Sequence, residues 1–135
     1  MIQEKKAQVS TEYLVLVGFL LVLITVLSSY ALFSYSETNK TTQANNALIK
    51  LKNSAENIYA FGPGNKDVVK IFLPQGTTNS DVSGILISFD VNFAGGTETI
   101  YSYVDVNVSG TLPSTDGIHF IRLEVVGNQV VFSEG

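Results

Sequence analysis

The chain of 135 residues is long enough for one small domain and an anchor segment, but not for two full domains. Its formal net charge is −4 and no basic stripe is present, which argues against a nucleic acid as a partner. It contains no cysteine, which excludes both a disulfide framework and a thiolate metal site.

A short charged leader stands before a long apolar segment. Lys5 and Lys6 are followed by the small residue Ala7, and residues 13–33 are almost entirely apolar. About 21 helical residues rise about 30 Å, which is the hydrocarbon thickness of a bilayer. An ordinary secretory signal has its cleavage site after a shorter apolar run. Here the small residue comes first, so a cut after Ala7 would leave the apolar helix on the mature protein.

The charges around this segment predict its orientation. Lys5 and Lys6 lie on its amino side, whereas the first cation after it is Lys40. Loops rich in lysine and arginine stay in the cytoplasm. We therefore expect the leader to be cytoplasmic and the remainder of the chain to be exported.

Small and weakly polar residues interrupt the apolar segment at Gly18, Thr25, Ser28 and Ser29. Small residues let membrane helices approach one another closely, so these positions are candidates for helix contacts. Isolated glycine and serine are also common in single spans that pair with nothing. Both interpretations remain open from the sequence.

Residues 44–60 carry one apolar stripe at helical spacing. Its members are Ala44, Ala47, Leu48, Leu51, Ala55, Ile58 and Tyr59. The sequence predicts one helix from near Ser10 to near Ala60, in which the span and the stripe form a single rod. The helix should end at residues 61–65, because glycine favours a helix cap and proline cannot continue the hydrogen bonding.

After residue 61 the apolar period changes from helical to two, which is typical of strands. Residues 94–97 and Gly127-Asn128 have the composition of hairpin turns. The apolar phase shifts within residues 118–126, which predicts a bulge near Phe120. The sequence predicts five strands, mostly antiparallel, at residues 69–73, 85–93, 100–108, 118–126 and 130–132.

A sheet domain of about 75 residues is marginal alone and needs a cover for its apolar face. The stripe of residues 44–60 is the available cover. We therefore predict an α+β fold shaped like a lollipop, with a leader at 1–7, a long helix at 8–60 and an antiparallel head domain at 61–135.

The sequence shows no catalytic constellation. His119 has no second histidine or cysteine to complete a metal site, and the carboxylates are scattered singly. We therefore predict no enzyme activity, no metal and no cofactor. Two glycosylation triplets occur, at Asn39 and at Asn107, and Asn107 is the better candidate because it lies on the polar side of a predicted strand.

The residues around the predicted cut resemble a known family. The pattern Gln-x-Ser-x-Glu-x-x-x-Leu directly follows the basic leader, at Gln8, Ser10, Glu12 and Leu16. It resembles the class III signal peptide of archaeal type IV pilin-like proteins. The resemblance implies cleavage by a prepilin peptidase between Ala7 and Gln8, and assembly of the mature helices into the core of a surface filament. Many members carry glycine where this chain has Ala7.

The first hypothesis is therefore a pilin, a structural subunit of a type IV pilus-like filament used for adhesion or surface contact. Its expected partners are identical or related subunits in a helical homopolymer, the prepilin peptidase and, before assembly, the membrane. Glu12 and Gly18 are the candidate assembly residues. Two alternatives remain: a membrane-anchored surface binding protein, and a minor pilin or tip adhesin. Subunits of the archaeal motility filament usually lack this pattern.

Overall fold

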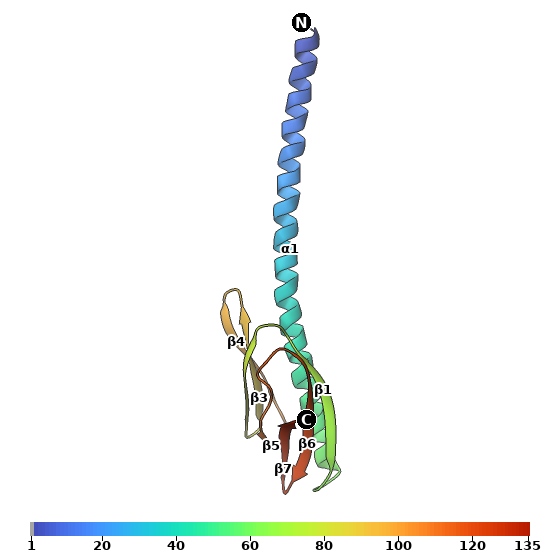
Figure 1. The fold of residues 1–135 in the computed structure, drawn as a ribbon, viewed down its shortest axis with the longest axis vertical. Helices are drawn as coiled ribbons and strands as arrows, with labels where there is room; N and C mark the ends of the chain where they lie inside the picture. The colour runs from blue at the N-terminus through green and yellow to red at the C-terminus, as the bar shows by residue number, and fades with distance from the viewer. Residues whose placement is uncertain (1) are drawn as a thin grey trace. The chain divides into compact units, whose positions relative to one another are not determined.

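The computed structural model describes the backbone of residues 2–135 and the side chains from Lys5 onward. It contains one long helix, α1 (Ile2–Ala60), followed by seven strands in two sheets (Figure 1). The chain divides into two units, residues 1–36 and residues 37–135. The predicted α+β fold, a long N-terminal helix followed by a small and mostly antiparallel β domain, is confirmed. The side chains of the first four leader residues lie outside the description.

Helix α1 begins earlier than predicted. We expected a start near Ser10, but the leader is helical from Ile2 onward because its glutamine, glutamate, lysine and alanine residues are strong helix formers. The predicted end at Ala60 is confirmed. Gly62 has a φ of 96°, which only glycine adopts readily, and its N–H donates to a carbonyl of the last turn. The Asn65 side-chain amide donates to two more carbonyls of this end, both at 2.9 Å.

The strands form two sheets of different size. Their bounds are β1 (Lys66–Leu73), β2 (Thr77–Ser83), β3 (Leu86–Phe93), β4 (Gly96–Tyr103), β5 (Asn107–Gly110), β6 (Gly117–Val126) and β7 (Gln129–Glu134). The larger sheet has the order β1-β6-β7-β5, and the smaller has the order β2-β3-β4. Every neighbouring pair is antiparallel except β5 and β7.

The predicted count of five strands is wrong for two reasons. Strand β2 was not predicted because Val82 is its single apolar residue, which leaves no alternation to detect. The predicted strand at 100–108 is split between the two sheets, as β4 and β5. The N–H groups of Val104 and Val108 donate to the carbonyls of Ile85 and Gly84, at 2.8 and 2.7 Å. The chain therefore changes sheets around the turn between β2 and β3.

The predicted bulge near Phe120 is also wrong. The pairing of β1 with β6 is continuous from Lys66 opposite Glu124 to Leu73 opposite Gly117. Phe120 instead points away from the core and is 51% exposed. The apolar phase shift in the sequence reflects an apolar outer face rather than a bulge. The register shift found in the structure lies on β2, at residues 77–79.

One hydrophobic core joins the helix to both sheets. The helix contributes six residues that are at most 4% exposed: Ala44, Ala47, Leu48, Leu51, Ala55 and Ile58. Tyr59, which we placed on the same stripe, is 37% exposed at the end of the helix. The larger sheet contributes the inward rows of β1, β6 and β7, and the smaller sheet contributes Ile87 and Phe89 of β3.

Two helix carboxylates fasten the chain on either side of β4. Glu37 Oε1 accepts a hydrogen bond of 3.0 Å from the Ala94 N–H, and Glu56 Oε1 accepts one of 3.1 Å from the Asp105 N–H. The two glutamates are separated by about 28 Å of helix rise. The two hydrogen bonds therefore attach the residues just before and just after β4 to points far apart along the helix.

We expect Leu51→Ala to lower the free energy of unfolding by about 2 to 5 kcal/mol, because it leaves a cavity at a side chain that is 0% exposed. Ile49→Ala is the matched control, since Ile49 lies on the same helix but is 52% exposed. Urea unfolding of residues 37–135 measures both variants. A Leu51→Ala protein that unfolds together with the parent would show that the helix does not cover the sheets.

Candidate assembly and processing site

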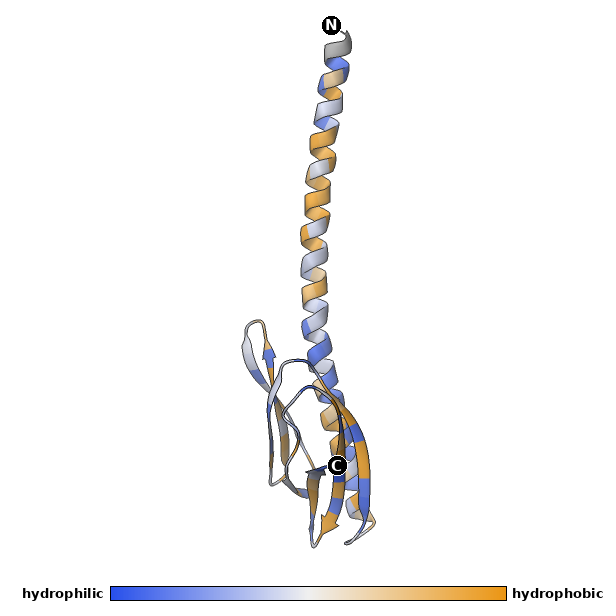
Figure 2. Cartoon of the chain, viewed as in Figure 1, coloured by the Kyte–Doolittle hydropathy of each residue, from blue (hydrophilic) through white to orange (hydrophobic). Residues whose placement is uncertain are grey.

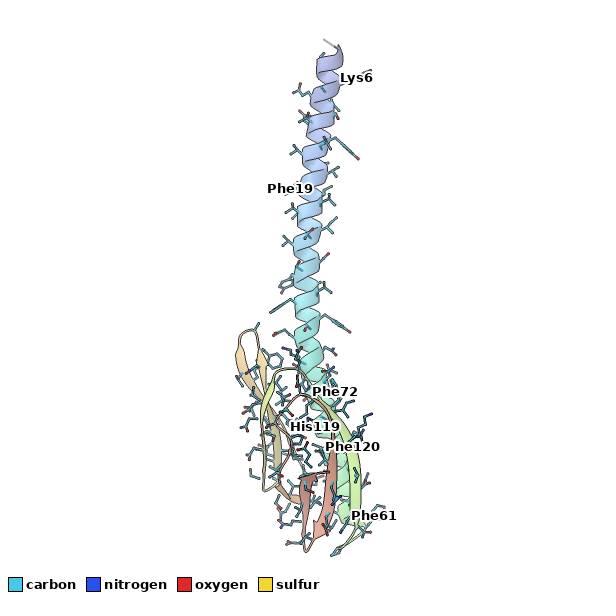
Figure 3. The ribbon with its side chains drawn as sticks, in the orientation of Figure 1. Lys6, Phe19, Phe61, Phe72, His119 and Phe120 are labelled. Carbon is cyan, nitrogen blue, oxygen red and sulfur yellow. The ribbon has the colours of Figure 1, made fainter. Side chains whose placement is uncertain are left out.

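The first unit presents an apolar helix surface without internal cover. Among the described residues, one helix is long and apolar enough to cross a membrane, and none of its most apolar stretch is buried. Figure 2 shows this run of apolar residues along the upper part of α1. Phe19 projects outward from the helix in Figure 3 and is 62% exposed. A signal sequence near the N-terminus and the core helix of a soluble protein can both meet these criteria of length and composition, but such a core helix would be mostly buried.

The residues of the signal motif all lie on α1 and are exposed. Gln8, Glu12 and Leu16 are spaced four residues apart, so they follow one another along one face of the helix. Ser10 lies two residues from Gln8 and therefore points to the opposite side. The structure thus brings three of the four motif residues together.

The bond predicted to be cut lies next to a side-chain hydrogen bond. Thr11 Oγ1 donates to the Ala7 carbonyl at 2.9 Å. A cut between Ala7 and Gln8 would remove that acceptor, together with the leader carbonyls that accept from the following backbone N–H groups. It would therefore leave a hydroxyl and several N–H donors without acceptors immediately before Glu12. Within the described residues the Glu12 carboxylate forms no hydrogen bond or ion pair.

The small and hydroxyl residues of the segment behave in two ways. Thr25 Oγ1 donates to the Leu21 carbonyl at 2.8 Å, and Ser29 Oγ donates to the Thr25 carbonyl at 2.9 Å. These hydroxyls are therefore satisfied within their own helix. At Gly18, an added Cβ would meet nothing within 4 Å. The missing side chain leaves a smooth position where another helix could approach.

The two glycosylation triplets have different geometries. Asn107 is exposed at the start of β5, and Ser109 lies two residues on along the strand, on the same side. Asn39 is exposed on α1, where Thr41 points to the opposite side of the helix and donates to a carbonyl of the preceding turn. The acceptor amide and its hydroxyl are therefore aligned only at Asn107.

His119 is held inside a hydrogen-bonded network rather than lying on an open surface. Its Nδ1 is 3.0 Å from Glu134 Oε1, and its Nε2 is 2.9 Å from the Thr115 carbonyl. The ring ties the loop before β6 and the last strand to β6 itself. Among the described side chains, no cluster of three or more histidine or carboxylate groups could hold a metal ion. The sequence could not reveal this network, because Glu134 lies 15 residues after His119 on another strand.

A groove of about 390 Å³ runs between α1 and β1 in the second unit. Gln43, Asn46 and Lys50 line it from the helix, and Lys70 and Phe72 line it from the strand. The groove carries two amines and no carboxylate, so it lacks an acid and base pair. The groove could not be predicted from the sequence, because Lys50 and Lys70 lie on different elements that come together only in the fold.

Comparisons with protein-family models, with curated proteins and with solved structures each found no match to this chain. Its function is therefore inferred from its own residues. The features with a direct bearing are the uncovered apolar helix, the motif at the predicted cut, and Glu12, whose carboxylate has no partner among the described side chains.

We expect the mature chain to begin at Gln8, because a small residue and a basic leader directly precede the motif while the apolar segment remains uncut. Mass spectrometry of the N-terminal peptide measures this. A new terminal glutamine can also lose ammonia and cyclise, which the same spectrum would reveal. Recovery of an intact leader from assembled material would contradict the prediction.

If the exported chain is a glycoprotein, we expect the glycan on Asn107 rather than on Asn39, because only Asn107 has its hydroxyl partner on the same side of the backbone. Asn107→Gln should then remove the glycan mass from the intact protein, whereas Asn39→Gln should leave it unchanged. Intact-protein mass spectrometry compares the two variants. A glycan that persists in Asn107→Gln and disappears in Asn39→Gln would reverse the assignment.

Proposed function

We propose that the chain is a structural subunit of an archaeal type IV pilus-like surface filament, used for adhesion or surface contact. The observation that supports this most directly is the uncovered apolar segment that starts within the Gln8–Leu16 motif. In the filament, the equivalent helices of identical or related subunits would cover one another. The compact second unit would then form the outer surface.

The energetics of the apolar segment require such a cover. Burial of one valine, leucine or phenylalanine side chain is favourable by about 1.5 to 3 kcal/mol. The first cover is the cytoplasmic membrane, which holds the precursor before assembly. Lipid tails are as apolar as these side chains, so the hydrophobic effect does not drive helices together inside a membrane. Helix association there depends on close packing and on polar contacts. Gly18 supplies a position for close packing, and Glu12 supplies a polar group.

Glu12 would link processing to assembly. At the membrane edge water and headgroups solvate its carboxylate, whereas inside a bundle of helices an unpaired charge costs several kcal/mol. The groups freed by cleavage, which include the Thr11 hydroxyl, are suitable donors to the Glu12 carboxylate of an adjacent chain. A cyclised Gln8 would remove the terminal amine as a donor and leave the hydroxyls and backbone N–H groups of the neighbour.

One alternative also accounts for the apolar segment. A single helix that remains in the membrane would anchor a surface binding protein and would need no helix neighbours. The location of the mature chain distinguishes the two. A filament subunit is recovered in fibres sheared from the cell, whereas an anchored protein is recovered only after detergent extraction.

We expect Glu12→Gln to abolish filaments while subunit level and leader cleavage stay normal, because the amide cannot replace the carboxylate in the contact between subunits. Glu98→Gln is the matched control, since Glu98 is an exposed carboxylate in the second unit. Electron microscopy of sheared fibres, with immunoblots of whole cells, measures all three quantities. Abundant filaments of ordinary length in Glu12→Gln cells would rule out the assembly role.

A further inference from the structure

The outer face of β1 and β6 combines cations with exposed apolar side chains. We call it the basic face. It consists of Lys66, Val68, Lys70 and Phe72 on β1, and Ile118, Phe120, Arg122 and Glu124 on β6. Phe72 is 48% exposed and Phe120 is 51% exposed, and Figure 3 labels both on this part of the structure.

The cations of the basic face are mostly uncompensated. The face holds three cations and one carboxylate, and the single ion pair joins Lys66 to Glu124 at 3.7 Å. Among the described residues, Lys70 and Arg122 have no ion-pair partner. A positive and aromatic surface has therefore formed on a chain whose net charge is −4.

The outer face of the smaller sheet has the opposite charge. We call it the acidic face. It consists of Asn79, Asp81 and Ser83 on β2, Leu86, Ser88 and Asp90 on β3, and Thr99, Tyr101 and Tyr103 on β4. It carries two carboxylates and no cation. The rings of Tyr101 and Tyr103 meet edge to face at 5.8 Å, and both side chains are more than half exposed.

The carboxylates of the acidic face are placed differently. Asp90 accepts hydrogen bonds from Thr99 at 2.6 Å and from Asn79 at 3.3 Å, which fix its orientation. The Asp81 carboxylate has no hydrogen bond or ion pair within the described residues. It lies in the same cross-strand row as Tyr101, so a free carboxylate and an exposed ring stand near each other.

We propose that the basic face of one copy of this chain binds the acidic face of the next copy. The charges are complementary, and each face offers two aromatic rings to the other. Arginine and lysine also interact favourably with the faces of tyrosine rings. Two basic faces, or two acidic faces, would repel each other. The inference rests on the proposed filament and adds the contact between the outer units of its subunits.

The contact joins two different surfaces, so it does not form a closed symmetric dimer in which the same surface of each copy meets. The two faces lie on the outer sides of two sheets that share one core, and each copy therefore has one face free after binding. Such a heterologous contact produces an extended series of copies or a ring. Opposite charges would fix orientation and suppress wrong contacts more than they add affinity. Salt should weaken the contact, since the Debye length is about 8 Å at physiological ionic strength.

Thiol cross-linking of the full chain in its cells tests the contact. The chain contains no cysteine, so introduced thiols are the only ones it carries. Val68→Cys labels the basic face, and Ser83→Cys labels the acidic face at an exposed position. A flexible bismaleimide then joins thiols on adjacent copies. We expect a ladder of dimers, trimers and longer species from the double variant, and no dimer from either single variant.

Two further samples sharpen this experiment. A mixture of the two single variants should stop at dimers, since each copy then carries one thiol. Val68→Cys with Asn128→Cys is the matched control, because Asn128 is exposed on the turn between β6 and β7 and belongs to neither face, so this pair should give no ladder. On the ladder-forming background, Lys70→Glu should reduce cross-linking several-fold, and addition of Asp81→Lys should restore it.

Each failure has a different meaning. An amine-reactive cross-linker joins neighbouring copies in any arrangement, because lysines occur in both units. Amine cross-links without a thiol ladder would overturn the face-to-face contact while leaving the filament subunit in place. The absence of both would overturn the contact and the proposed function together. Dimers from Val68→Cys alone would show that like faces meet, which also overturns the contact.

Discussion

The structure depends on how the apolar side chains of one long helix are covered, and this differs between the two parts of the helix. Within residues 37–60, two sheets of the same chain bury the apolar stripe almost completely. Within residues 13–33, nothing in the described structure covers the apolar side chains. Exposure of these side chains to water would be costly in free energy, because burial of apolar surface is the dominant favourable term in folding and association. The chain therefore buries only part of its apolar surface by its own folding and leaves the rest uncovered in the described structure.

The covered part of the helix is suited to its position between sheets. Ala44, Ala47 and Ala55 are small, so the strands can approach the helix backbone closely, and Leu48 and Leu51 fill the remaining space. Burial alone would not fix how the strands lie along the helix, because the hydrophobic effect is non-directional. The hydrogen bonds that the Glu37 and Glu56 carboxylates accept from backbone N–H groups supply that direction on either side of β4.

Periodicity in the sequence predicted the elements whose burial depends on apolar spacing. It found the helix, its end, and the turns at residues 94–97 and 127–128, because each has a local chemical signal. It failed at β2, whose inward Ser80 is satisfied by a hydrogen bond of 2.8 Å to the Leu112 carbonyl rather than by apolar packing. It also failed at Phe120, because an exposed aromatic residue looks like a core residue in a pattern.

How far each candidate site could be predicted depends on whether its residues lie close together in the sequence. The motif around Glu12 is contiguous in sequence, so its residues could be named before the fold was known. The Glu134 partner of His119, and the basic and acidic faces, depend on strand pairings between residues far apart in the chain. No local pattern carries that information.

An uncovered apolar helix can associate in many registers, because apolar packing gives affinity without orientation. Polar groups discriminate among these registers, since an unpaired carboxylate or a pair of like charges in contact is costly. In the proposed filament Glu12 would select the offset between helices. The two charged faces would select the rotation between outer units. Glu12 and the two charged faces belong to different units of the chain, so a change at the outer faces would alter the arrangement of the outer units while the helix core could still form.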